Sequence, residues 1–305
     1  MAIYSIFEAF FIRVMSFIGY IFSLLPGGLG DPFEYLFMQR ALLTAILVGV
    51  VCGILSNFIV LKKWALLGDS ISHAVLPGVA FAYLLGLPFA AGAFVAGLIA
   101  AGGMSFIEIN SRIKEDAAMG IILTSFFAAG VIIISRIATS THLMHILFGN
   151  VLGVQMDALI LTAIISLITL FFVKIYFNEL LIYTFDPIQA SALGLNRSFF
   201  HYGLMFLITM TIVASLETVG IILVVAMLIT PGATAYLLTD RLSIMILISS
   251  SIGFVSSVVG LYVSFAYNVA SGASIVIVMS IIFMVILIMS PKYGILKLDQ
   301  KLQGS

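Results

Sequence analysis

An aspartate and a histidine, Asp69 and His73, stand four residues apart within a long apolar stretch of the sequence. A separation of four places both side chains on one face of a helix, about one turn apart. Carboxylate oxygen and imidazole nitrogen are donors that suit manganese, iron(II) or zinc, whereas copper(I) prefers thiolates. The pair therefore predicts a two-ligand half-site for a divalent cation.

The same residues also admit a structural interpretation, in which Asp69 caps a helix that begins after Gly68 and His73 bonds to a neighbouring helix. Pro77 adds to the ligand hypothesis because it has no N–H to donate to the carbonyl of His73, which predicts a kink beside the pair. Two ligands from one chain are too few for a metal ion. A twofold dimer with this helix at its axis would bring two Asp and two His together.

Two more histidines, His142 and His145, stand three residues apart on the side of the membrane that is predicted to be external. One interpretation is a role in metal entry at the outer rim. The other, which is commoner for such a pair, is an ordinary polar edge of a short surface helix.

The elements that must position these residues are strongly apolar. Of 305 residues, 63% are hydrophobic and 9% are charged, against roughly a quarter charged in soluble domains. Hydrophobic stretches of about twenty residues recur, and each is long enough to cross a hydrocarbon core of about 30 Å. The sequence therefore predicts an all-α, polytopic helical membrane protein.

Nine segments are predicted to span the membrane, and the stretch 3-25 is a tenth candidate that would otherwise lie flat in the interface. The nine are 42-60, 64-86, 88-107, 117-137, 159-182, 199-216, 218-238, 243-265 and 272-290. Thirteen basic and thirteen acidic residues cancel, so no surface for nucleic acid is expected. The single cysteine, Cys52, excludes an internal disulfide.

The orientation follows from the basic residues, which favour the cytoplasmic side in short connections. One set of connections holds nine of them: Lys62, Lys63, Arg112, Lys114, Arg197, Arg241, Lys292, Lys297 and Lys301. The other set offers only Arg40 and Arg136. We therefore expect the C-terminus to lie in the cytoplasm.

The connection 184-196 carries the signals of a short helix outside the membrane. Asp186 is a favourable N-cap, Pro187 suits the first helical position, and Gly194 suits the residue past the end. So short a helix is unstable alone and is expected to pack against something, although a simple turn is also compatible. No phosphate-binding loop, nucleophile elbow or H-E-x-x-H motif occurs in the chain. If the chain takes part in transport that is driven by ATP hydrolysis, a separate subunit must therefore hydrolyse the ATP.

Three stretches closely resemble the permease subunits of bacterial metal-ion ABC importers of the ABC-3 type, which carry manganese, zinc or chelated iron. They are GDSISHAVLPG at 68-78, HILFGN at 145-150 and AMLITPGATAYLL at 226-238. The resemblance runs from about residue 38 to the end. It implies a permease domain at 38-305 and an apolar extension, interfacial or transmembrane, at 1-37.

The resemblance also implies function. In that family the permease dimerises, couples to cytoplasmic ATPase subunits and receives metal from an extracytoplasmic binding lipoprotein. The family's intramembrane carboxylate and histidine correspond to Asp69 and His73. Its coupling segment corresponds to 185-194, with Phe185, Asp186, Pro187, Ala190 and Gly194 as the residues expected to engage the ATPase.

These observations predict a transport subunit of a bacterial plasma membrane rather than an enzyme, with no permanently bound cofactor. The sequences TPGATA at 230-235 and FDP at 185-187 resemble the manganese and iron branch of the family more than the zinc branch. Manganese is therefore the favoured cargo. The alternatives are a secondary carrier driven by an ion gradient, and a scaffold that transports nothing.

Overall fold

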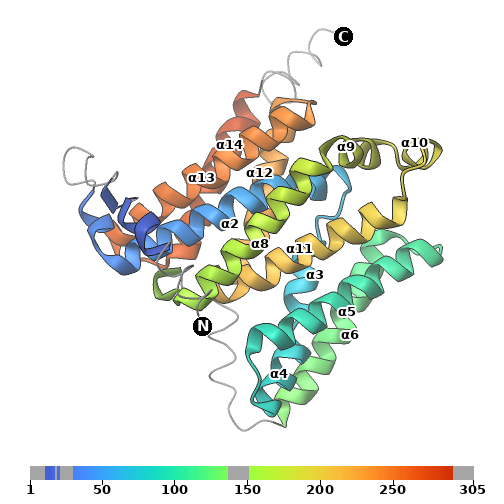
Figure 1. The fold of residues 1–305 in the computed structure, drawn as a ribbon, viewed down its shortest axis with the longest axis horizontal. Coiled ribbons are helices and arrows are strands. Elements are labelled where there is room, and N and C mark those ends of the chain that lie inside the picture. The colour runs from blue at the N-terminus through green and yellow to red at the C-terminus, as the bar shows by residue number, and fades with distance from the viewer. Residues whose placement is uncertain (1–10, 18, 21–29, 137–150, 291–305) are drawn as a thin grey trace.

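A computed structural model describes residues 11–17, 19–20, 30–136 and 151–290, and all regular structure in these ranges is helical. The elements are η1 (Asp31–Glu34), α2 (Leu36–Leu61), α3 (Leu67–Ala74), α4 (Leu76–Leu85), α5 (Phe89–Asn110), α6 (Glu115–Ser135), η2 (Val151–Gly153), α8 (Met156–Ile175), α9 (Phe177–Phe185), α10 (Pro187–Ala192), α11 (Arg197–Val219), α12 (Ile221–Leu238), α13 (Leu242–Tyr267) and α14 (Ser271–Met289). Figure 1 shows their arrangement.

The predicted all-α membrane fold is confirmed, with one difference in how the spans are built. Eight helices of the described residues are long and apolar enough to cross a membrane. The second predicted span, 64-86, is instead divided into α3 and α4, which are interrupted at Val75. Pro77 lies in the first turn of α4, where its missing N–H costs no hydrogen bond. The predicted kink is therefore a one-residue interruption at Val75, which keeps helical angles (φ −76°, ψ −16°).

A second difference lies at the end of the predicted span 159-182. α8 stops at Ile175, and the chain turns at Tyr176 (φ −101°, ψ 26°) before α9 begins. The residues of α9 remain largely apolar, so hydropathy alone does not reveal the turn. It redirects the chain towards α10.

The helices form two groups that meet along α3 and α11 (Figure 1). In one group, α2 packs against α12 and α13, and α14 packs against α12 and α13. In the other group, α4, α5 and α6 pack against one another. α11 contacts helices of both groups, and α3 packs against α5, α6, α11 and α12. A movement of one group relative to the other would therefore change the contacts of α3.

Small residues let the helices of the first group approach closely. A Cβ atom added to Gly253 of α13 would collide with the backbone carbonyl of Gly49 on α2. A Cβ atom on Gly232 of α12 would lie 2.6 Å from the carbonyl oxygen of Ser56, also on α2. Close backbone approach of this kind is typical of helices that associate in lipid.

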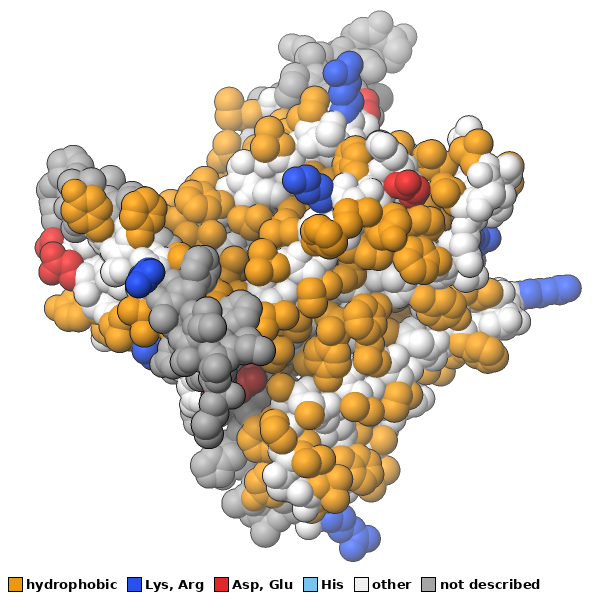
Figure 2. Space-filling view, in the orientation of Figure 1, with side chains coloured by type: hydrophobic (Ala, Val, Ile, Leu, Met, Phe, Trp, Pro, Cys, Tyr) orange, Lys and Arg blue, Asp and Glu red, His pale blue; other side chains and the backbone are white. Residues whose placement is uncertain are grey.

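The outer surface is apolar, as expected of a chain surrounded by lipid and partner subunits. Apolar side chains cover most of the face shown in Figure 2, and charged side chains on it are few. In the most apolar 18-residue stretch of α6, only 17% of the residues are buried within the chain, and the same holds for α14. Much of this surface therefore meets lipid or another protein.

Candidate metal site and coupling helix

The short helix α3 positions both candidate metal ligands. Its N-cap is Leu66, which makes no side-chain capping bond, and Asp69 lies within the first turn rather than at the cap. The interpretation that Asp69 caps a helix beginning after Gly68 is therefore wrong. Its carboxylate is free of that structural task.

Asp69 and His73 face each other along α3. Nε2 of His73 lies 3.5 Å from Oδ1 of Asp69, and the two side chains are 35% and 48% exposed, respectively. Two ligand atoms that each lie about 2.1 Å from one metal ion are separated by about 3 to 3.5 Å, depending on the angle between them. The observed separation therefore suits joint coordination of a single divalent cation.

The packing around α3 fixes the histidine ring. The ring of His73 meets the ring of Phe127 on α6 edge to face, with centroids 5.5 Å apart. α6 approaches the break between α3 and α4 at Gly130, where an added Cβ would lie 2.9 Å from Cβ of Leu76 and 3.1 Å from the nitrogen of Pro77. Nδ1 of His73 is buried and has no hydrogen-bond partner, so Nε2, which faces Asp69, is the nitrogen placed for a ligand.

The described residues of α3 offer two candidate metal ligands, Asp69 and His73. Within the described residues, no three His, Cys, Asp or Glu side chains are grouped so that they could hold a metal ion. A metal ion held by Asp69 and His73 would therefore need further ligands from another source. The half-exposed position of the pair leaves it accessible to them.

The short helix predicted in the connection 184-196 is confirmed as α10. The side chain of Asp186 accepts hydrogen bonds from the backbone N–H groups of Ile188 (3.0 Å) and Gln189 (2.9 Å). Pro187 occupies the first helical position, and Gly194 follows the helix with a positive φ of 81°. The capping chemistry read from the sequence therefore describes the actual geometry.

α10 and the residues on either side of it expose several apolar side chains. Ile188 is 80% exposed, Leu193 61% and Phe185 55%, whereas Ala190 is fully buried. Exposed apolar side chains grouped in this way are typical of a surface that contacts lipid or another protein. α9 and α10 lie together at one edge of the bundle in Figure 1.

Comparison with known proteins gives a consistent result. Residues 34–290 match the model of the ABC 3 transport family. The chain belongs to this family. It is 51% identical over 263 residues to the manganese transport system membrane protein MntC of Listeria monocytogenes, covering 86% of this chain and 94% of MntC.

Two further comparisons agree. The chain is 46% identical to the chelated iron transport system membrane protein YfeD of Yersinia pestis, over 88% of this chain and 89% of YfeD. It is also similar to a chain in the solved structure of PsaBC from Streptococcus pneumoniae in complex with Fab, with a TM-score of 0.77, 47% identity, and coverage of 87% of this chain and 96% of that chain. This ABC-3 chain is therefore a multi-pass transport subunit of the plasma membrane and not an enzyme.

The cap of α10 in this ABC-3 protein can be tested directly. Replacing Asp186 by Ala removes both capping bonds, and such a loss costs about 1 kcal/mol. Amide hydrogen exchange at Ile188 and Gln189 should become roughly fivefold faster. Asn retains the accepting oxygen, so Asp186→Asn is the matched control. Equal exchange in the two variants would contradict the capping role.

The structure gathers most of the basic residues that the sequence assigns to one side. Five of them line a polar pocket of about 490 Å³: Lys62, Lys63, Arg112, Lys114 and Arg197. We call this region the basic end. The candidate outer-rim residues, His142 and His145, lie outside the described residues.

The basic end also holds residues that the sequence interpretation missed. Glu108 lies at the end of α5, and its Oε2 is 3.7 Å from Nε2 of His201 on α11. Nδ1 of His201 lies 3.0 Å from the hydroxyl of Tyr183 on α9. An ionisable residue at a helix end was the signal for Glu108, but its partners lie on other helices and no local pattern identifies them.

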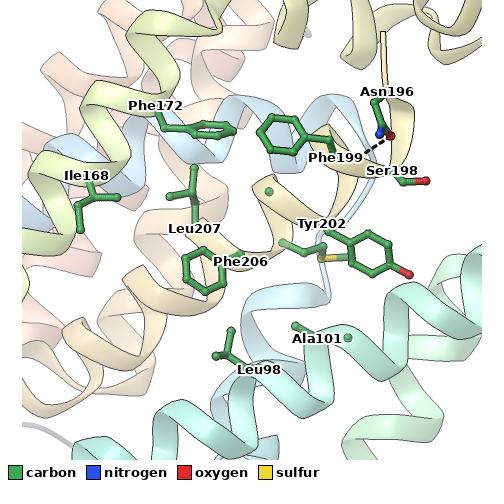
Figure 3. A pocket seen from close by; sticks show the side chains of 13 residues that line it. Leu98, Ala101, Ile168, Phe172, Asn196, Ser198, Phe199, Tyr202, Phe206 and Leu207 are labelled. Atoms are coloured by element: carbon green, nitrogen blue, oxygen red, sulfur yellow. Dashed lines mark hydrogen bonds between the residues drawn. The ribbon is translucent and has the colours of Figure 1, made fainter.

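A larger groove elsewhere has no metal-binding character. It lies between α5, α8 and α11, has a volume of about 690 Å³, and is lined by apolar side chains such as Phe172, Phe206 and Leu207 (Figure 3). None of its 13 lining residues is Asp, Glu, His or Cys. The groove therefore offers no carboxylate, imidazole or thiolate ligand, unlike α3.

Proposed function

We propose that this ABC-3 chain is the membrane-spanning subunit of an ATP-driven importer of divalent transition metals, with manganese as its principal cargo. The observation that carries the proposal is the Asp69–His73 pair, 3.5 Å apart and half-exposed on a short helix between apolar spans. An ionisable pair at membrane depth is costly to keep unless it has a function. The relatives named for manganese and chelated iron transport support this cargo class.

A second copy of the chain supplies the missing ligands in this proposal. Two Asp69 carboxylates and two His73 rings converge at a twofold axis, and bidentate carboxylates raise the coordination number towards six. Affinity must stay moderate, because a conducting site has to release its ion.

The proposed orientation places the basic end and α10 in the cytoplasm, together with the C-terminus. The exposed apolar side chains of α10 then dock on an ATPase subunit, and Phe185, Asp186, Pro187, Ala190 and Gly194 form the coupling segment. An extracytoplasmic metal-binding lipoprotein delivers the ion to the opposite end. The permease domain comprises 38-305, and 1-37 lies outside it.

Competition between metals tests the cargo. Cells that depend on this importer should take up radioactive manganese, and unlabelled manganese should compete better than iron(II) or zinc. Oxygen and nitrogen ligands alone do not exclude the other two metals, so total cell metal content must be measured as well. Zinc that competes better than manganese would overturn the manganese assignment.

Reconstitution tests the energy source. Membranes that contain the chain and a co-purified subunit with a phosphate-binding loop should take up metal only with ATP. Uptake by the purified chain alone, driven by an ion gradient, would show a secondary carrier instead. Absence of both activities would indicate a scaffold.

A further inference from the structure

One lysine joins the coupling region to the segment that leads into α3. Lys62 follows the last residue of α2, and its Nζ donates a hydrogen bond to the backbone carbonyl of Tyr183 over 2.9 Å. The same Nζ lies 3.7 Å from the centroid of the Tyr183 ring, a cation–π contact. Tyr183 belongs to α9, and a single residue, Asp186, separates α9 from α10.

A second route connects the same two segments. The hydroxyl of Tyr183 lies 3.0 Å from Nδ1 of His201. The His201 ring meets the ring of Trp64 edge to face, with centroids 5.4 Å apart. Trp64, Tyr183 and His201 are at most 3% exposed. Lys62 and Trp64 belong to one loop, so both routes run from α9 to this loop.

The loop 62-66 is short and held at several points. The N–H of Trp64 donates to the carbonyl of Ile59 over 2.8 Å, and the N–H of Leu67 donates to the carbonyl of Trp64 over 2.9 Å. Lys63 has a φ of 60°, a left-handed conformation that L-residues other than Gly, Asn and Asp rarely adopt. A displacement at Lys62 or Trp64 must therefore reach α3, which begins at Leu67, instead of being absorbed by the loop.

The charges around this network argue against a second binding site for the transported metal ion here. The polar pocket of the basic end is lined by five basic side chains but only three acidic ones, Glu108, Glu115 and Asp116. A divalent cation would meet net positive charge there. The network is therefore better suited to hold segments together than to bind the cargo.

We propose that the contacts of Lys62 and His201 with Tyr183 transmit movement of α9 and α10 to α3, which makes Lys62 a positioning residue for Asp69 and His73. This inference rests on the proposed function, because it requires that α10 engages the ATPase. When ATP closes the ATPase pair, α9 moves with α10, and the loop 62-66 moves α3. The separation or exposure of the two metal ligands then changes.

The charge on Lys62 gives the mechanism a pH signature. Burial, followed by the nearby Arg197 guanidinium, lowers the pKa of Lys62 to about 8, against the opposing effect of Glu115 and Glu108. These groups, together with Tyr183 and His201, are titratable or charged groups that face it from α11, α6, α5 and α9. As pH rises through about 8, Lys62 becomes neutral and the cation–π contact is lost.

The test compares metal transported with ATP hydrolysed in the reconstituted complex of this chain and its ATPase. Lys62→Met should lower the metal transported per ATP by about tenfold, within the range for mutations that change coupling between sites. Lys62→Arg should restore most of the ratio, because a guanidinium keeps the charge and the donor. Lys63→Met, an exposed neighbour with the same loss of charge, should leave the ratio unchanged.

Two more measurements separate coupling from folding. Tyr183→Phe removes only the hydroxyl that meets His201, so it should assemble normally and lower the ratio less than Lys62→Met. The ratio of the natural chain should fall as pH rises through about 8, while that of Lys62→Arg should not. If Lys62→Met does not assemble, the Tyr183→Phe ratio and this pH profile decide.

The outcomes distinguish this inference from the proposed function. A natural complex without ATP-dependent metal uptake would overturn the proposed function itself. A natural complex that transports metal, with Lys62→Met at the natural ratio, would overturn only the transmission role. An equal fall in metal transported per ATP in Lys62→Met and Lys63→Met would overturn it as well. Such a result would reflect the loss of one positive charge and not the contacts of Lys62.

Discussion

Cells that carry Asp69→Ala or His73→Ala are expected to accumulate at least about a hundredfold less metal than cells with the natural chain. Loss of residues that merely orient metal ligands already costs 10- to 100-fold, and these two side chains are the proposed ligands themselves. Each substitution removes one donor from both copies in a dimer, so half of the four side-chain ligands disappear. Uptake of radioactive manganese by cells that lack other manganese importers measures the effect.

A control on the same helix separates ligand loss from helix damage. Ser72 of α3 donates its hydroxyl hydrogen bond to the carbonyl of Gly68 within the helix, over 2.7 Å. Ser72→Ala removes that bond and leaves Asp69 and His73 in place, so uptake should remain near normal. All variants should reach the membrane in equal amounts. Normal uptake by Asp69→Ala and His73→Ala would end the ligand hypothesis.

The second large effect concerns stability. Gly253→Ala is expected to destabilise the chain by about 3 kcal/mol, the upper part of the usual range for overpacking. The added Cβ would collide with the carbonyl of Gly49, and a backbone group within a helix cannot move aside as a side chain can. α13 and α2 must therefore separate. Thermal unfolding of the purified protein in detergent measures the loss.

Another helical glycine provides the matched comparison. A Cβ added to Gly102 of α5 meets nothing within 4 Å, and Ala favours a helix over Gly by up to about 1 kcal/mol. Gly102→Ala should therefore be neutral or slightly stabilising. A Gly253→Ala variant as stable as Gly102→Ala would show that the contact between α2 and α13 is looser than the structure describes.

The parts of the fold that local chemistry determines could be predicted from the sequence. Long apolar runs gave the spans, and the order Asp186, Pro187, Gly194 gave α10, because capping depends on neighbouring residues. Asp69 and His73 share a helical face by spacing alone. The ligand role of this pair still rests on the proposed function, as does the docking role of α10.

Other features depend on residues that are distant in the sequence and could not be predicted in this way. Lys62 and Tyr183 are 121 residues apart, and their contact exists only because α2 and α9 end near each other. The turn at Tyr176 separates two apolar segments, so hydropathy predicted one continuous span. The close approach of Gly49 to Gly253 likewise joins residues that are distant in the sequence, and no local pattern reveals it.

The division of the predicted span 64-86 also bears on how the protein enters the membrane during synthesis. α3 and α4 have eight and ten residues, which at about 1.5 Å per residue reach roughly 12 and 15 Å, well short of a bilayer core of about 30 Å. Longer apolar helices such as α14 can enter the lipid singly. We expect the nascent segment with Asp69 and His73 to wait at the insertion machinery until α5 and α6 emerge and cover it.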